Sequence, residues 1–285
     1  MDRRTESGRL RLPRFPPSGT AKAMSGRLRF PLPPRTLVGL ATVLVLMLAW
    51  FLATDVAGLV NRQRVPSPSD VLAAAHQIVV QGYAGGTLLT QAFYSLRLVV
   101  LGFLIAAATG TPLGLLMGLS RRFEAFINPA FLLVRPIPPL AWIPLAIVWL
   151  GLGDSAKILV IWFAAFVPAV INSYTGVRGV DPVLVAAARV HGASSGQVLR
   201  EVLVPGAMPM IFTGLRLSLQ ASWTTLVAAE LVGAFFGLGK VLISAYRDIY
   251  PAMIAVAMIT VGLFGALTTK VLALVEHRVL KWRAP

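Results

Sequence analysis

Six apolar runs, each long enough to cross a lipid bilayer, constrain this chain more than any other feature of its sequence. A membrane-spanning helix needs about 20 mainly apolar residues. Because backbone polar groups in lipid must be satisfied within the protein, runs of this length predict helices. The sequence therefore predicts an all-α membrane protein with six transmembrane helices, at 37–60, 96–119, 130–150, 158–177, 211–234 and 252–275.

The third run, 130–150, departs from the pattern of a regular helix. Besides Arg135, it contains Pro136, Pro138, Pro139 and Pro144. These prolines remove backbone donors and prevent a regular helix across the first half of the run. Irregular backbone at membrane depth is tolerated only where it is buried in protein or lines a water-filled path.

Basic residues predict the orientation of the spans. With the N-terminus inside, 17 basic residues fall on the inner side and five on the outer side, while the other four lie within or beside spans. Loops rich in lysine and arginine stay in the cytoplasm, so both termini are expected there. The net charge of +15 does not indicate nucleic-acid binding, because nine of the 26 basic residues lie in the first 35 positions and the others punctuate apolar runs.

The chain divides into three parts. Residues 1–35 are rich in Arg, Pro, Gly and Ser and are expected to form a disordered, basic cytoplasmic tail that contacts anionic lipid. The apolar run after them is too long for a signal peptide and lacks a clear cleavage site, so it is expected to remain as the first span. Residues 36–278 are expected to form one transmembrane domain, and 279–285 a cytoplasmic C-terminal tail.

A polar island at 181–205, between the fourth and fifth runs, carries helix signals. Asp181, followed by a proline, is typical of a helix start, and Gly192 is typical of a helix end. Ser194, with a glutamine three residues later, predicts a capping box. The second helix that begins there is expected to end at Pro205.

This island resembles the coupling loop of bacterial ABC-importer permeases, in which Glu-Ala-Ala is followed by three intervening residues and a Gly, with a Pro thirteen residues beyond that Gly. Ala186 stands where the family usually has glutamate, which removes a polar contact but not the helix-turn-helix shape. An ordinary loop between spans with an alanine-rich helix is the alternative. By resemblance, the residues that couple to the ATPase are Ala186, Ala187, Ala188, Arg189, Gly192, Ala193 and Pro205.

Two further segments resemble the same family. Residues 135–157, RPIPPLAWIPLAIVWLGLGDSAK, are similar to its Arg-Pro-x-Pro-x-x-Ala-x-x-Pro-Leu run and the Ser-Ala-Lys that follows. Residues 214–239 are similar to its fifth span. The chain is identified as a member of the ABC-importer permeases of the nitrate/sulfonate/taurine/bicarbonate group, which implies the type I permease fold.

The segment after the first span also resembles this group. VPSPSDVL at 65–72 is similar to the external start of sulfonate, taurine and nitrate importer permeases. Ser69 or Asp70 is expected to cap a short helix there that reaches Ala75. A generic proline turn is the alternative.

The resemblance implies the partners of the chain and its location. Two ABC ATPase subunits would bind and hydrolyse ATP, a second permease copy would complete a homodimer, and a periplasmic or lipid-anchored binding protein would deliver substrate. The location would be the bacterial inner membrane. The chain itself has no nucleotide-binding loop, no cysteine and three scattered histidines, so no cofactor, metal site or catalytic residue is expected.

Ionisable residues inside spans are costly, so they are candidates for a translocation path. Arg216 either reaches the inner headgroups or lines an anion path. Glu230 either reaches the outer interface or pairs with a cation, Lys240 or Arg247. Since Arg216 and Glu230 are fourteen residues apart, about 21 Å along a helix, they cannot pair within one helix. The path candidates are Arg135, Pro138, Trp142, Arg216, Trp223 and Glu230.

The membrane arginines favour a small oxyanion, such as a sulfonate, nitrate or bicarbonate, as the substrate. A neutral or cationic nutrient of the thiamine-precursor type stays open as an alternative. An ion-coupled secondary carrier would require paired half-repeats and a midplane carboxylate, and the sequence has neither. A membrane-embedded enzyme would require a catalytic cluster, which the sequence also lacks.

Small residues spaced four apart form a ridge along the second run. They are Gly102, Ala106, Gly110, Gly114 and Gly118. This spacing places them on one helix face, where another backbone can approach closely. The ridge packs either against a helix of the same chain or against the second copy.

Overall fold

The computed structural model describes residues 35–56, 61 and 64–282, so the predicted tail before Arg35 lies outside the described residues. Within them there is no strand, only one isolated bridge between Tyr83 and Gly86. In chain order, the helices are α1 (Arg35–Phe51), η1 (Leu52–Val56), α2 (Pro68–Val80), α3 (Leu88–Leu119), α4 (Arg121–Val134), η2 (Pro139–Trp142), α5 (Ile143–Leu150), α6 (Asp154–Arg178), α7 (Pro182–Val190), α8 (Ser195–Gln197), η3 (Val198–Leu203), α9 (Val204–Gly233), α10 (Leu238–Arg247) and α11 (Pro251–Val279). The all-α prediction is confirmed.

The candidate spans agree in number with the sequence. Five helical segments are long and apolar enough to cross a membrane, and a bent pair of helices makes a sixth. Helices α3, α4 and α6 begin 4 to 9 residues earlier than the predicted spans, because their first turns contain polar residues. The second span, for example, starts at Leu88 after the capping Thr87, not at 96.

The third span is broken where its prolines cluster. Helix α4 begins after the capping Ser120, which is earlier than the predicted start at 130. The chain then bends by 83° between 121–134 and 139–150. Proline lacks the amide proton that a continuous helix needs at these positions, so the predicted irregular backbone is confirmed.

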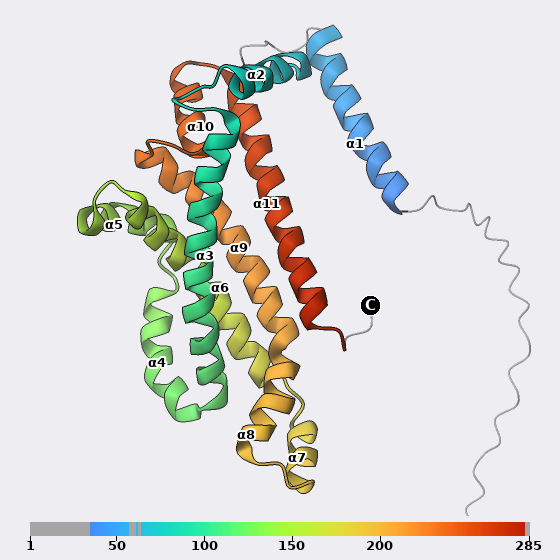
Figure 1. Ribbon diagram of the computed structural model, residues 1–285, viewed down its shortest axis with the longest axis vertical. Coiled ribbons are helices and arrows are strands. Elements are labelled where there is room, and N and C mark those ends of the chain that lie inside the picture. Colours follow the sequence, from blue (N-terminus) through green and yellow to red (C-terminus); the bar gives the residue numbers. More distant parts are fainter. Residues whose placement is uncertain (1–34, 57–60, 62–63, 283–285) are drawn as a thin grey trace, which may run out of the picture. The chain divides into compact units, whose positions relative to one another are not determined.

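Contacts divide the chain into two units, Met1–Met47 and Leu48–Pro285. The helices α2 to α11 belong to the second unit. Helix α6 packs against both α3 and α9. In Figure 1, α7 and α8 lie at one end of these helices, and α2 and α10 lie at the opposite end. We call the end with α7 and α8 the helix-pair end, and the end with α2 and α10 the outer end.

The glycine ridge of α3 faces α6. A Cβ atom on Gly102 would lie 2.5 Å from the side chain of Ile161, and one on Gly114 would lie 2.3 Å from the carbonyl oxygen of Val170. Glycine is therefore required for the two backbones to approach this closely. Of the two alternatives for the ridge, packing within one chain is the one observed.

Helix α2 begins earlier and ends later than the sequence predicts. Ser67, rather than Ser69 or Asp70, is its capping residue. The Ser67 hydroxyl accepts from the amide of Asp70 at 3.2 Å, and the Asp70 carboxylate accepts from the amide of Ser67 at 3.1 Å. The proline that follows Ser67 favours the first helical position, which explains why the helix starts here.

Candidate functional site

Helices α7 and α8 form a short helix pair, residues 181–197, whose caps were all predictable from local sequence. The Asp181 carboxylate accepts from the amide of Val183 at 2.8 Å. Gly192 has a φ of 81°, the left-handed conformation of a helix end. Ser194 accepts from the amide of Gln197 at 3.3 Å and donates its own amide to that side chain at 2.8 Å. These three predictions are confirmed.

The helix pair is almost entirely uncovered. Within 181–197, all of which the structure describes, no residue is buried. Val183 is 69% exposed and Val190 is 85% exposed, and the two lie on the same helix with Leu184, which is also exposed. Ala186, Ala187, Ala188, Arg189, Gly192 and Ala193 line the same short structure. Apolar side chains presented on a polar loop are typical of a protein-binding surface.

Pro205 does not end the second helix, so that prediction is wrong. The six residues before it, Val198–Leu203, form a π-helix, and Pro205 lies in the first turn of α9. A π-helical turn shifts the hydrogen-bond register. This shift accommodates a ring that would otherwise collide with the carbonyl four residues back. The helix pair therefore continues directly into a membrane span.

The break in the third span forms a pocket that contains two of the predicted path residues. Arg135 ends α4, and Trp142 closes the η2 turn that begins after Pro138. Arg135 and Trp142 both line the pocket. Trp142 also stacks on Phe163 of α6, with ring centroids 4.1 Å apart. A guanidinium beside an aromatic wall can attract an anion and exclude water from one side of it.

Arg216 has a partner that the sequence did not reveal. It forms an ion pair with Glu276 of α11, 60 residues away in sequence. The ion pair ties Arg216 to α11, while its side chain remains 45% exposed. Its reach to the inner headgroups and its place on an anion path both stay predictions. No local pattern links positions this far apart, which is why sequence reasoning missed Glu276.

Trp223 lies in the packed interior. It is 5% exposed, and its indole N–H donates to the hydroxyl of Thr268 on α11 at 3.1 Å. Leu98, Leu219, Leu226 and Leu238 belong to the same buried cluster. In this structure, Trp223 connects α9 to α11.

Glu230 is fully buried, and its contacts correct both expectations for it. Its carboxylate accepts from the hydroxyl of Ser95 on α3 at 2.8 Å and from the amide of Gly239 at 2.8 Å. It therefore neither reaches the interface nor takes Lys240 or Arg247 as its partner. The turn after α9 folds back, so that the start of α10 lies against the carboxylate.

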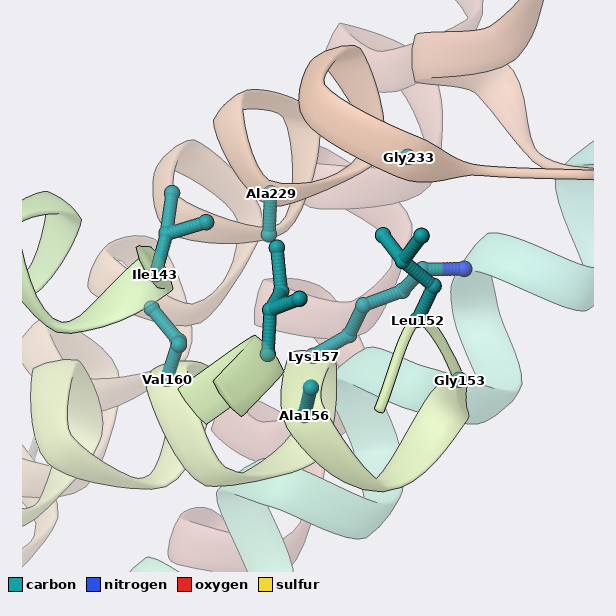
Figure 2. Close-up of a pocket in the computed structure, with 9 residues that line it drawn as sticks. Ile143, Leu152, Gly153, Ala156, Lys157, Val160, Ala229 and Gly233 are labelled. Carbon is teal, nitrogen blue, oxygen red and sulfur yellow. The ribbon is translucent and has the colours of Figure 1, made fainter. Parts of the chain in front are cut away.

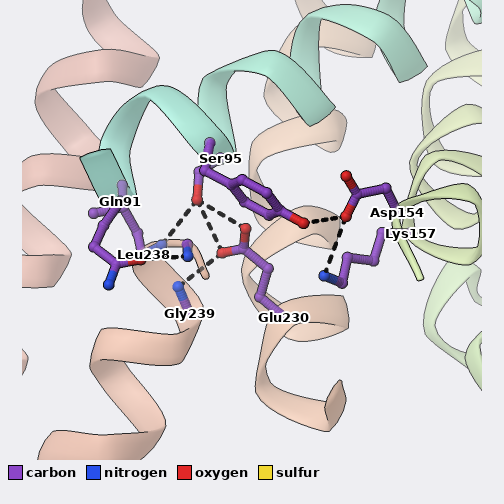
Figure 3. A network of polar contacts seen from close by, with 9 residues as sticks. Gln91, Ser95, Asp154, Lys157, Glu230, Leu238 and Gly239 are labelled. Carbon is purple, nitrogen blue, oxygen red and sulfur yellow. Dashed lines mark hydrogen bonds and ion pairs between the residues drawn. The ribbon is translucent and has the colours of Figure 1, made fainter. Parts of the chain in front are cut away.

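Three consecutive amides at this turn are held by three side chains, as Figure 3 shows. Gly237 donates to the side-chain oxygen of Gln91 at 2.6 Å, and Leu238 donates to the hydroxyl of Ser95 at 2.8 Å. Gly239 donates to Glu230, as described above. We call Gln91, Ser95, Glu230 and the amides of 237–239 the outer cluster.

A second polar group lies beside the outer cluster in Figure 3. The hydroxyl of Tyr94 donates to Asp154, the first residue of α6. Lys157, only 6% exposed, lies 3.7 Å from the same carboxylate. Its ammonium also lies over the Tyr94 ring, 5.5 Å from the centroid. The first turns of α3 thus hold the start of α6 as well as the start of α10.

A small pocket between α5, α6 and α9 has a mainly apolar lining, which includes Ile143, Val160 and Ala229. Figure 2 shows that Lys157 contributes its stem to this lining while its nitrogen points away from Ile143 and Val160. The ammonium is engaged with Asp154. The pocket therefore offers mainly apolar surface, and its one charged side chain, Lys157, is already paired with Asp154.

Residues 110–281 match the family of binding-protein-dependent transport system inner membrane components. The chain belongs to this family. It is also 35% identical over 255 residues to the taurine transport system permease protein TauC of Escherichia coli (strain K12), covering 89% of this chain and 92% of that protein. It is 34% identical over 258 residues to the nitrate import permease protein NrtB of Synechocystis sp., covering 89% and 92%.

The fold of this permease also has a counterpart among solved structures. A chain of the MetNI methionine ABC transporter, in an inward-facing conformation, aligns with a TM-score of 0.53 and 23% identity, covering 70% of this chain and 96% of that one. The predicted family and the predicted ABC-importer permease fold are confirmed, and the permease is a multi-pass membrane protein.

Proposed function

We propose that this permease is the membrane subunit of an ATP-driven importer and that it forms the translocation path for a small oxyanion. A sulfonate such as taurine, nitrate and bicarbonate are the candidates. The relatives named for taurine and nitrate support this class. Arg135 at the pocket in the broken span supplies a positive charge suited to such substrates.

The exposed helix pair is the observation that carries the proposal. Separate ATPase subunits, one for each permease copy, would bind the apolar surface around Val183 and Val190. Gly192 would set the angle between the two short helices. Since α8 continues through η3 into α9, a movement of the ATPase would act directly on a membrane span.

The remaining partners follow from the same proposal. A second permease copy would complete a homodimer, and a periplasmic or lipid-anchored binding protein would deliver substrate at the outer end. The helix-pair end and both termini would lie in the cytoplasm of a bacterial cell, with residues 36–278 as the domain in the inner membrane. Residues 1–35 and 279–285 would be cytoplasmic tails, and the first of these would contact lipid.

The proposed path combines exposed and buried residues. At the broken span, Arg135 attracts the anion, while Pro138 and Trp142 shape the irregular wall. Arg216 contributes only where its ion pair with Glu276 opens. The other two candidates, Trp223 and Glu230, are buried in one copy and act by holding the helices behind the path.

The test is reconstitution with a partner ATPase and binding protein encoded beside this chain. We expect the ATPase to co-purify with the permease, and proteoliposomes to take up labelled taurine, nitrate or bicarbonate only when ATP is supplied. Uptake of a thiamine precursor instead would establish the alternative substrate class. Uptake driven by an ion gradient without ATP would contradict the importer proposal.

A further inference from the structure

Helix α9 connects the two ends of the permease without a break. The helical path that begins at Ser195 in the helix pair continues to Gly233. From Ala207 to Glu230 this path covers 23 residues, which corresponds to about 35 Å at the rise of an α-helix. A displacement of the helix pair along this helix would therefore reach Glu230.

Close packing against α6 stiffens this helix. A Cβ atom on Gly214 would lie 2.5 Å from the side chain of Asn172, and one on Gly176 would lie 2.9 Å from the carbonyl oxygen of Ala207. Backbones that approach this closely have little room to bend independently. The α6–α9 pair is thus suited to transmit movement over its length.

At its outer end, α9 is attached to α3 and α10 through Glu230. The carboxylate is 0% exposed and receives donors from Ser95 and from the first turn of α10. These hydroxyl and amide donors satisfy the oxygens of a side chain that burial has removed from water. A buried group with this many partners holds its neighbours in one arrangement.

The backbone around Glu230 is shaped to fit this side chain. Gly237 has a φ of 122°, and a Cβ atom there would lie 2.1 Å from a carboxylate oxygen of Glu230. A Cβ atom on Gly239 would lie 2.4 Å from the Cβ of Glu230. Both glycines are therefore needed for the turn to close over the carboxylate.

We propose that Glu230 is a positioning residue that passes the movement of the helix pair to the outer end of the permease. The carboxylate joins α9 to α3 through Ser95 and to α10 through the amide of Gly239. Gln91 of α3 also holds α10, by accepting from the amide of Gly237. Through Tyr94, α3 also holds the start of α6. The outer ends of these four helices then move as one body when the helix pair moves. This inference rests on the proposed function. It assigns the site that links the helix-pair end of the permease to the outer end.

The test uses Glu230→Gln, which keeps the side-chain size but replaces one acceptor oxygen with an NH₂ donor. In the complex reconstituted with its ATPase and binding protein, we expect uptake of taurine or nitrate per ATP hydrolysed to fall about tenfold, with ATPase binding unchanged. The matched control is Glu124→Gln. Like Glu230, Glu124 accepts side-chain hydrogen bonds from another helix, in its case from Tyr174 and Arg178 of α6. It does not belong to the outer cluster. We expect this control to transport like wild type.

A second readout reports on the contact itself. In Glu230→Gln, we expect hydrogen exchange at the amide of Gly239 to rise about tenfold, because a single oxygen remains for the two donors, the hydroxyl of Ser95 and the amide of Gly239. Ser95→Ala removes only one hydroxyl group. The same measurements can be made on this variant if Glu230→Gln does not assemble. We expect it to lower uptake per ATP while leaving ATPase binding intact.

The outcomes separate this inference from the proposed function. Wild-type protein that takes up none of taurine, nitrate and bicarbonate with ATP would contradict the proposed function. Wild-type uptake with undiminished uptake per ATP in both Glu230→Gln and Ser95→Ala would overturn the positioning role alone. An equal loss in the Glu124→Gln control would also overturn it, since the effect would then not depend on the outer cluster.

Discussion

At the scale of single residues, the structure separates what local sequence encodes from what the fold creates. The caps at Asp181, Gly192 and Ser194 were predictable because each depends on neighbours within three positions. The partner of Glu230 was not, because Ser95 lies 135 positions away. Glycines spaced four residues apart predicted which face of α3 packs against another helix, but not that this helix is α6.

Gly192 provides the first test at this scale. Its φ of 81° would cost a valine about 1–2 kcal/mol, so we expect Gly192→Val to insert normally and to lose much of its binding to the ATPase. Co-purification of the two subunits measures this. The control is Gly196→Val, at an exposed glycine with negative φ where a Cβ would meet no described atom within 4 Å. Equal ATPase binding by both variants would contradict the coupling role of Gly192.

Arg216 provides the second test. Arg216→Gln leaves Glu276, whose side chain is 13% exposed, without its partner, so we expect lower expression. Adding Glu276→Gln removes the unpaired charge and should restore expression. If Arg216 attracts the anion, uptake per assembled complex stays low in the double variant. Recovery of uptake together with expression would show that Arg216 acts only through its ion pair.

At the scale of elements, apolar length and proline position predicted the spans and the break in the third. They did not predict the helix boundaries, because polar first turns such as that of α3 do not stand out from loops. Pro205 is the clearest failure. A proline normally ends a helix, but the π-helix before it lets the helical path continue.

The contact between α3 and α6 can be tested at Gly114. A methyl group there would lie 2.3 Å from a carbonyl oxygen of α6, so we expect Gly114→Ala to destabilise the permease by about 1–3 kcal/mol. Thermal unfolding in detergent measures this. Gly262→Ala is the matched control, because a Cβ on that helical glycine of α11 meets no described atom within 4 Å. A melting temperature lowered equally by both would contradict the close packing of α3 on α6.

The loop before α3 and the turn after α10 are joined outside the spans by Tyr83 and Asp248. Burial, followed by the hydrogen bond to Asp248, raises the pKa of Tyr83 above its ordinary value of 10.0. The folded state therefore holds this proton more tightly than the unfolded state does. The contact contributes its full stability below about pH 10 and loses it as the pH rises further.

Alkaline unfolding measured by tyrosine absorbance checks this sign. We expect Tyr83→Phe to be less stable than wild type at pH 8 and to approach it above pH 10. The matched control is Tyr246→Phe, at an exposed tyrosine of α10. A difference between wild type and Tyr83→Phe that grows with pH would contradict the assignment.

At the scale of the whole molecule, the distribution of basic residues makes the orientation testable. The second unit places the helix pair at one end and α2, which Ser67 caps, at the opposite end (Figure 1). We expect reporter domains fused after Arg200 and after Trp282 to be cytoplasmic, and one inserted near Ser67 to be external. Accessibility of these reporters in intact cells measures this. An external reporter after Arg200 would reverse the orientation.

The broken third span has a consequence for how the chain is made. Its second half, η2 and α5, packs against α6, and α6 leaves the ribosome later. Exposed irregular backbone is not tolerated in lipid. The third span therefore reaches its final position only after the fourth has been synthesised and inserted. We therefore expect the two spans to settle in the bilayer together, because a nascent chain that stops before Asp154 lacks the surface of α6 on which α5 packs.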